Sequence, residues 1–208
     1  MDYVNPFDLW AEEYDRWYDE NEWAFLSEVE AIKQFLKSGR CIEIGAGTGR
    51  FSLALDVDYA VEPSEAMAKI AKKRGVNVIV GRGECLPFED ESFDNVLLIF
   101  VLCFVEDPLS LIKESYRVLK TGGRLIIGII DKNSPLGREY EQKKVSSKFY
   151  RHARFYSAEE VISILRKCGM KIIGTRQTIF CSPNKLRGVD RIEDGHGRGL
   201  FAVICAEK

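Results

Sequence analysis

The sequence predicts an α/β fold in which helices cover both faces of a doubly wound, mostly parallel sheet. From residue 40 onward, short apolar runs alternate with helix-like patterns, which is the order that parallel sheets require. The stretch CIEIGAGTGRFSLAL, residues 41–55, places an acid and three glycines between two apolar runs. This order is typical of a strand, turn and helix that bind a nucleotide-like ligand. A length of 208 residues suits one domain, so we assign 1–208 to a single domain.

Composition excludes several classes of protein. Hydrophobic residues make up 46% of the chain and the net charge is −2, which is an ordinary globular balance without the basic footprint of a nucleic-acid binder. The longest apolar run, VLLIFVLCFV at 96–105, is shorter than the roughly 20 residues of a membrane span and indicates a strand buried on both faces. No cationic start leads into an apolar signal region, so we expect a cytoplasmic protein that does not enter a membrane. The six cysteines form no close pair, and we expect reduced, buried thiols and no metal site.

The first forty residues predict two helices. Trp10, Tyr14, Trp17 and Tyr18 recur at helical spacing among acids. A second apolar face ends near Gly39 and consists of Phe25, Leu26, Val29, Ile32, Phe35 and Leu36. We expect residues 1–38 to form a helical segment that precedes the sheet.

Strands are expected at 40–44, 57–61, 77–80, 94–100 and 123–130. Ser64 and Gly75 mark the ends of one helix between them. Asp107 and Pro108 begin another, which we expect to end at the two glycines of KTGG, residues 120–123.

The last third of the chain contains one polar segment and three further elements. Residues 131–156 are polar and irregular, and indicate an insertion after the fifth strand. Ser157 and Glu160 stand at capping-box spacing and begin a helix. Two strand-like runs, KIIGTRQTIF and LFAVICAE, flank a loop at 181–199.

The glycine-rich turn alone is compatible with three ligands: a nucleoside triphosphate, a nicotinamide dinucleotide, or a smaller molecule that carries a single adenosine. A P-loop needs Lys followed by Ser or Thr after its last glycine, but Arg50 and Phe51 follow Gly49. The dinucleotide pattern G-x-G-x-x-G fits Gly45 and Gly47, but Arg50 occupies its third glycine position. An acid at Glu43 suits a cationic ligand better than a pyrophosphate. Glu62, at the end of the next strand, can accept hydrogen bonds from ribose hydroxyls, which NAD and other adenosine ligands share.

Four motifs in order resemble those of class I S-adenosylmethionine-dependent methyltransferases. They are EIGAGTGR, VEPSEAM, GRGECLPFEDESFDNVLL (with the LPF of one subgroup) and ESYRVLKTGGRLIIGI, and they cover residues 40–130. The resemblance implies a three-layer Rossmann-like fold with a seven-stranded sheet whose last strand is antiparallel and inserted through the 170–179 and 199–206 pair. It also implies S-adenosyl-L-methionine as cofactor and a small-molecule methyl acceptor, in a monomer or homodimer without nucleic acid.

The resemblance also implies which residues hold the cofactor. The glycine turn would approach its methionine part and ribose, Glu62 the ribose hydroxyls, and the residues beside LPF its adenine. The complete implied set is Glu43, Gly45, Ala46, Gly47, Gly49, Glu62, Pro63, Gly83, Glu84, Val101 and Leu102.

Two positions depart from the family pattern. Relatives often carry an Asp where Arg82 stands, and an arginine cannot accept a hydrogen bond from the adenine amino group. Where relatives often place a pair of His after the fourth strand, this chain has Cys103 and Phe104.

We expect the acceptor side to come from the N-terminal helix and from residues 131–156, with Cys103 bordering the site. Tyr14 and Tyr18 lie in a segment that folds over the cofactor as a lid in similar enzymes, and 131–156 could form a substrate cap. The candidate catalytic residues are Tyr14, Tyr18, Cys103, His152, Arg154 and Tyr156. The alternatives to a methyltransferase are a non-catalytic S-adenosylmethionine-binding protein of the same fold and, less favoured because of Arg50, an NAD-dependent oxidoreductase.

Overall fold

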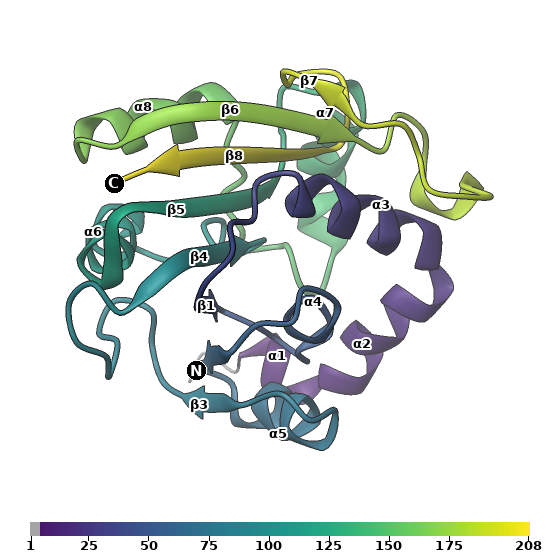
Figure 1. Ribbon diagram of the computed structural model, residues 1–208. Coiled ribbons are helices and arrows are strands. Elements are labelled where there is room, and N and C mark those ends of the chain that lie inside the picture. Colours follow the sequence, from purple (N-terminus) through teal and green to yellow (C-terminus); the bar gives the residue numbers. More distant parts are fainter. Residues whose placement is uncertain (1–4) are drawn as a thin grey trace.

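The computed structural model describes residues 5–208 and shows one mixed sheet with helices on both faces (Figure 1). The strand order is β3-β2-β1-β4-β5-β8-β6-β7. Neighbours from β3 to β5 are parallel, and β8 is antiparallel to both β5 and β6, between which it is inserted. The predicted fold, including the inserted antiparallel strand, is confirmed. The described strands are β1 Cys41–Ile44, β2 Tyr59–Glu62, β3 Val78–Val80, β4 Phe93–Ile99, β5 Leu119–Ile130, β6 Lys171–Thr178, β7 Glu193–Asp194 and β8 Phe201–Glu207.

The eighth strand, β7, is the one addition to the predicted sheet. It has two residues, pairs with the edge of β6, and lies within the segment 181–199 that the sequence predicts as a loop. It therefore adds an edge without changing the topology that positions the site.

The helices have the bounds α1 Pro6–Leu9, α2 Ala11–Glu20, α3 Glu22–Lys33, α4 Arg50–Ala54, α5 Glu65–Lys73, α6 Pro108–Val118, α7 Pro135–Lys143 and α8 Ala158–Lys167, with short 3-10 turns at Lys144–Ser146 and Pro183–Lys185. The first residues of the predicted N-terminal helix, 1–4, lie outside the described residues. None of the helices among the described residues is long and apolar enough to cross a membrane.

Three predicted helix starts are confirmed by their hydrogen bonds. The Ser64 hydroxyl accepts from the Met67 amide, and the Asp107 carboxylate accepts from the first amides of α6. Ser157 and Glu160 form both halves of the capping box of α8. Each cap satisfies backbone amides that have no partner inside the helix.

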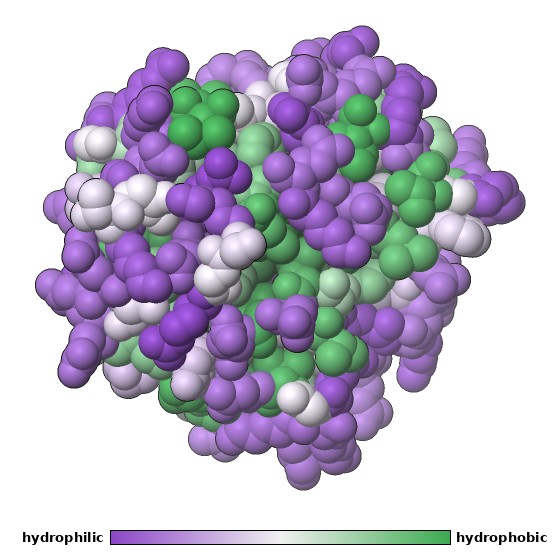
Figure 2. Space-filling model, in the orientation of Figure 1, coloured by the Kyte–Doolittle hydropathy of each residue, from purple (hydrophilic) through white to green (hydrophobic). Residues whose placement is uncertain are grey.

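Alternate residues of the central strands divide the core between the two faces of the sheet. Leu98 and Ile127 pack with the apolar sides of α6 and α8, whereas Leu97 and Ile126 pack with α2, α3 and α4. This alternation is what period-two side-chain geometry produces in strands that are covered on both faces. Figure 2 shows that the surface in view is largely hydrophilic, with hydrophobic residues gathered near its middle.

The apolar run 96–105 is not one strand. β4 ends at Ile99, and Phe100 adopts a left-handed backbone with φ +58°. The chain then turns, and residues 101–104 leave the sheet at the carboxyl end of β4. Apolarity alone misled the prediction, because Leu102 is buried without lying in a strand and Phe104 is an exposed apolar residue.

The helix α6 ends earlier than KTGG predicts. It stops at Val118, and Leu119 already pairs with Phe93 as the first residue of β5. Gly122, with φ +74°, lies in a register shift inside this strand. The glycines thus serve an irregular strand rather than a helix end.

Residues 131–156 are more ordered than the predicted irregular insertion. Ser134 caps α7 by accepting from the Gly137 amide, and Pro135 occupies the first turn. Leu136 and Tyr140 of this helix pack against the core on the α3 side. A Ser-Pro helix start accounts for the difference, since both residues favour the first positions of a helix.

Candidate functional site

The glycine turn after β1 has a left-handed backbone at three positions. The φ angles of Gly45, Gly47 and Gly49 are +73°, +56° and +78°. A Cβ on Gly45 would lie 2.5 Å from Val101, and one on Gly49 would lie 2.9 Å from Ala71, so these two glycines permit close packing. A Cβ on Gly47 would meet only the Tyr14 ring, at 3.9 Å. Gly47 therefore leaves its backbone open to a ligand beneath Tyr14.

Glu62 ends β2 directly beside this turn. Its Oε2 accepts a hydrogen bond of 2.7 Å from the Gly47 amide, and its Oε1 accepts one of 2.9 Å from the Ser64 amide. Only 6% of the residue is exposed, and burial raises the pKa of its carboxyl. Each oxygen can accept a second hydrogen bond, so the carboxylate is positioned to receive two donors from a bound molecule.

Glu43 supplies a second buried carboxyl at the end of β1. It is 1% exposed and accepts a hydrogen bond from the Ser52 hydroxyl of α4. Burial, together with the charge of Glu62, raises the pKa of Glu43 to about 8. A cation bound near the turn would favour the ionised form of both carboxyls.

Helix α2 is fastened over the turn by one aspartate. The Asp15 carboxylate accepts hydrogen bonds from the Thr48 hydroxyl at 2.5 Å, from Arg50 Nε at 2.8 Å and from Arg74 Nη2 at 3.0 Å. Burial alone would raise the pKa of Asp15, but these donors hold it well below its usual value. The cluster links α2, the glycine turn and the end of α5.

Two neighbouring cavities are lined by residues of α2. The smaller one lies against the glycine turn and includes Glu43, Gly47 and Ile99. The larger one, which we call the aromatic cavity, has a volume of about 90 Å³ and is lined mainly by aromatic side chains. Its lining comprises Tyr14, Trp17, Tyr18, Glu28, Phe100, Ile130, Tyr140, Phe149, Tyr150, Pro183, Leu200 and Phe201. Tyr14 and Tyr18 line both cavities, and their hydroxyls lie 3.1 Å apart.

Comparison with known proteins identifies the family. Residues 42–127 match the model of a methyltransferase domain. A curated methyltransferase of uncharacterised activity from Staphylococcus carnosus is 30% identical over 77% of this chain and 81% of its own length. The structure also superimposes on a Thermotoga maritima protein described as a "SAM-dependent methyltransferase, possible histamine N-methyltransferase", with TM-score 0.95, 48% identity and 98% of both chains covered. The chain belongs to the S-adenosylmethionine-dependent methyltransferase family. An uncharacterised protein from Methanocaldococcus jannaschii is 51% identical over 99% of this chain and 100% of its own length.

The cofactor of this methyltransferase is therefore S-adenosyl-L-methionine, and the residues around the glycine turn fit it. The ligand carries a sulfonium, an ammonium and two ribose hydroxyls. Glu43 and Glu62 are buried acids that match its charges and donors, and the open backbone at Gly47 leaves room for it. Both the family model and the Thermotoga structure are methyltransferases, and neither is an NAD-dependent oxidoreductase.

The remaining residues implied for the cofactor divide into packed and open positions. Val101 contacts the turn at Gly45, and Leu102 is 1% exposed within the core. A Cβ on Gly83 would lie 2.5 Å from Ile44, so this glycine allows close packing. The other three positions are Ala46, which is buried in the turn, Pro63, which is exposed, and Glu84, which is partly exposed.

Arg82 stands where relatives often carry an Asp, but it does not replace that acid as a hydrogen-bond acceptor for adenine. Its side chain is 74% exposed and pairs with Glu84 at 3.3 Å. The guanidinium thus points to solvent.

The candidate catalytic residues fall into three groups. Tyr14 and Tyr18 line both the larger cavity and the cavity at the glycine turn. Cys103 and Tyr156 line a separate, smaller cavity beside β5, and burial raises the pKa of the Cys103 thiol to about 12. The two others, His152 and Arg154, have exposed side chains. Their roles in catalysis stay predictions.

Several residues of the site were not anticipated from the sequence. Asp15 and Arg74 hold α2 on the turn, and Glu28, Phe149 and Tyr150 line the larger cavity. Glu28 carried a usable signal, because it lies three residues after Phe25 and four before Ile32, on the apolar face of α3. Phe149 and Tyr150 carried none, since their approach to α2 depends on tertiary contacts.

Proposed function

We propose that this methyltransferase transfers the methyl group of S-adenosylmethionine to a small organic molecule bound in the aromatic cavity. One observation carries the proposal: Tyr14 and Tyr18 form a wall that the aromatic cavity shares with the cavity at the glycine turn. A molecule in the first cavity would thus lie next to a ligand in the second. The low net charge and the enclosed cavity favour a small acceptor over a nucleic acid.

Positioning is the main contribution that the chain would make to this reaction. The bound cofactor supplies an activated methyl group and a good leaving group, and transfer is an in-line displacement. Holding the acceptor and the methyl group in line can supply about 7–11 kcal/mol of the barrier. Helix α2, fastened by Asp15, carries the two tyrosines that line both cavities and would exclude water from them.

The two buried glutamates would bind the cofactor and hold its reactive end. Glu62 already orients the Gly47 and Ser64 amides and retains free lone pairs for the ribose hydroxyls. Glu43 lies in the cavity below the turn, where a carboxylate favours positive charge.

Calorimetry with S-adenosylmethionine and S-adenosylhomocysteine tests the first half of the proposal. We expect both to bind, and NADH, followed by fluorescence, not to bind. Failure of both adenosyl ligands to bind at millimolar concentration would refute the proposal.

Transfer of a radiolabelled methyl group to amines, phenols, thiols and carboxylates tests the second half. The name of the Thermotoga protein makes amines the first class to examine. Cofactor binding without transfer to any class would instead favour the second candidate, a non-catalytic cofactor-binding protein. That candidate is supported by Cys103 and Phe104 standing where relatives place a His pair.

A further inference from the structure

One carboxyl in the aromatic cavity has no partner within the described part of the chain. Glu28 of α3 is 3% exposed and lines the cavity. Its Oε2 atom is buried and has no hydrogen-bond partner among residues 5–208. A buried carboxyl without a partner is costly to a fold, so it calls for an explanation.

Among residues 5–208, the surroundings of Glu28 contain no cation that could balance its charge. The cavity lining among the described residues includes no Lys, Arg or His. The groups that interact with its charge are the hydroxyls of four tyrosines, Tyr14, Tyr18, Tyr140 and Tyr150. Burial raises the pKa of Glu28 well above its usual value. No residue from 5 to 208 supplies a positive partner for this carboxyl.

The other walls of the cavity suit an organic cation. Trp17, Tyr18 and Phe149 are among the aromatic rings that enclose the space. Aromatic faces attract ammonium groups, and the attraction is stronger where water is excluded. An acid surrounded by aromatic rings therefore combines two features that favour a protonated amine over a neutral alcohol of the same shape.

We propose that Glu28 is the carboxylate that binds a small primary or secondary amine as the methyl acceptor of this enzyme. The inference rests on the proposed function and names the substrate class of that site. Because Tyr14 and Tyr18 line both cavities, an amine bound to Glu28 would occupy the cavity next to the one at the glycine turn.

The same carboxylate provides a place for the proton that the amine must lose. An ammonium has no free electron pair, so the bound amine first gives one proton to the Glu28 carboxylate. The nitrogen lone pair then forms the bond to the methyl carbon, and the carbon–sulfur bond breaks with its electron pair left on sulfur. The product leaves as a methylated ammonium, and Glu28 returns its proton to solvent.

Binding experiments on the full chain test the inference without depending on turnover. The protein is saturated with S-adenosylhomocysteine, and 2-phenylethylamine and its neutral counterpart 2-phenylethanol are titrated by calorimetry. Glu28→Gln should weaken binding of the amine by about tenfold to a hundredfold, because one charge-assisted interaction is lost. Binding of the alcohol should be unchanged or tighter in the same variant.

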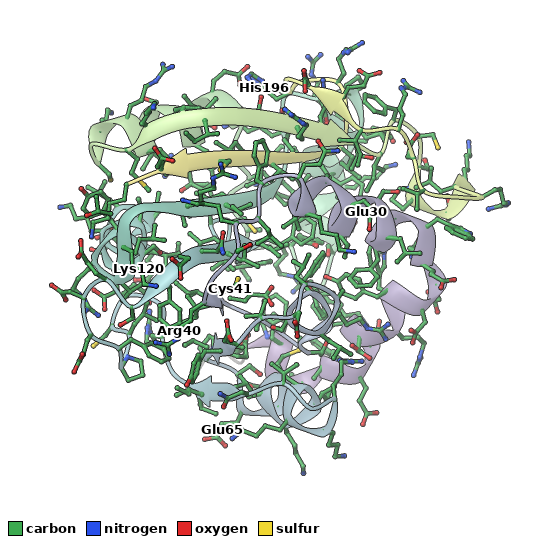
Figure 3. All side chains as sticks on the ribbon, in the orientation of Figure 1. Glu30, Arg40, Cys41, Glu65, Lys120 and His196 are labelled. Carbon is green, nitrogen blue, oxygen red and sulfur yellow. The ribbon has the colours of Figure 1, made fainter. Side chains whose placement is uncertain are left out.

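Glu30→Gln is the matched control, since Glu30 lies on the same helix but is exposed and paired with Lys33 at 2.9 Å (Figure 3). It should leave both affinities unchanged. Equal affinity of the wild type and Glu28→Gln for the amine would overturn the inference. If Glu28→Gln does not fold, the wild type decides: a preference for the alcohol, or no preference, overturns it. Failure of S-adenosylhomocysteine to bind the wild type would refute the proposed function instead.

Discussion

At the scale of single residues, the cofactor site depends on Glu62, whose two oxygens are each held by one backbone amide. We expect Glu62→Ala to weaken binding of S-adenosylhomocysteine by about tenfold or more, because a charge-assisted hydrogen bond contributes roughly 1.5–3 kcal/mol. Calorimetry measures the change. Glu65→Ala, three residues later on the exposed start of α5, is the control (Figure 3). An unchanged affinity in Glu62→Ala would contradict the assigned ribose contact.

Gly47 permits a second prediction at the same scale, since Gly169 also has a positive φ but follows α8, away from the glycine turn. The φ angles of the two residues are +56° and +79°, and a Cβ on Gly169 would meet nothing within 4 Å. Each change to Ala should lower the free energy of unfolding by about 1 kcal/mol. Only Gly47→Ala should also weaken cofactor binding, because its methyl group would enter the ligand space beneath Tyr14. Equal cofactor affinities in the two variants would show that Gly47 does not contact the ligand.

At the scale of elements, α2 is held over the glycine turn and the end of α5 through Asp15. Asp15→Asn removes the charge that Thr48, Arg50 and Arg74 share, and leaves two guanidinium groups close together without a partly buried anion. We expect faster amide hydrogen exchange across Ala11–Glu20 and weaker cofactor binding. Asp19→Asn is the control, since Asp19 also pairs with Arg50 but its side chain is 64% exposed. Protection of α2 that stays at the wild-type level in Asp15→Asn would contradict the role of this cluster.

The elements that the sequence predicted well are those whose signals are local. Ser64, Asp107 and the pair Ser157 and Glu160 each cap a helix through amides within three residues, so the pattern and the contact coincide. The helix α7 was missed because its polar composition obscured the start at Ser134. The interpretation of 96–105 as one strand was wrong because the residues after Ile99 are as apolar as β4 itself.

At the scale of the whole molecule, one half of the candidate site depends on local sequence and the other half depends on tertiary contacts. The cofactor half lies in two consecutive strand ends and their turn, a short stretch in which sequence order fixes spatial order. The acceptor half joins Tyr14 and Glu28 to Tyr150 and Phe201, residues that only the complete fold brings together. A motif can therefore predict the cofactor, while the acceptor requires the tertiary structure.

The stability of the whole molecule should decrease from mildly acidic to mildly alkaline pH. Folding raises the pKa of Glu43 from its usual 4.5 to about 8. Between these two values the folded chain keeps a proton that the unfolded chain has lost. The free energy of unfolding therefore falls as pH rises, by about 1.4 kcal/mol per pH unit for one such group. Glu28 and Glu62, whose pKa values are also raised, act in the same direction.

Asp15 acts at the other end of the pH range. Its pKa is lowered in the folded state, so its contribution is present above its usual value of 3.8 and is lost as pH falls further. Maximum stability is therefore expected between these two regions, near pH 5. Chemical denaturation at pH 5, 6.5 and 8 measures the trend. Glu43→Gln, which cannot ionise, should flatten the decline between pH 5 and 8, and a slope equal to that of the wild type would show that Glu43 is already ionised in the folded chain at pH 5.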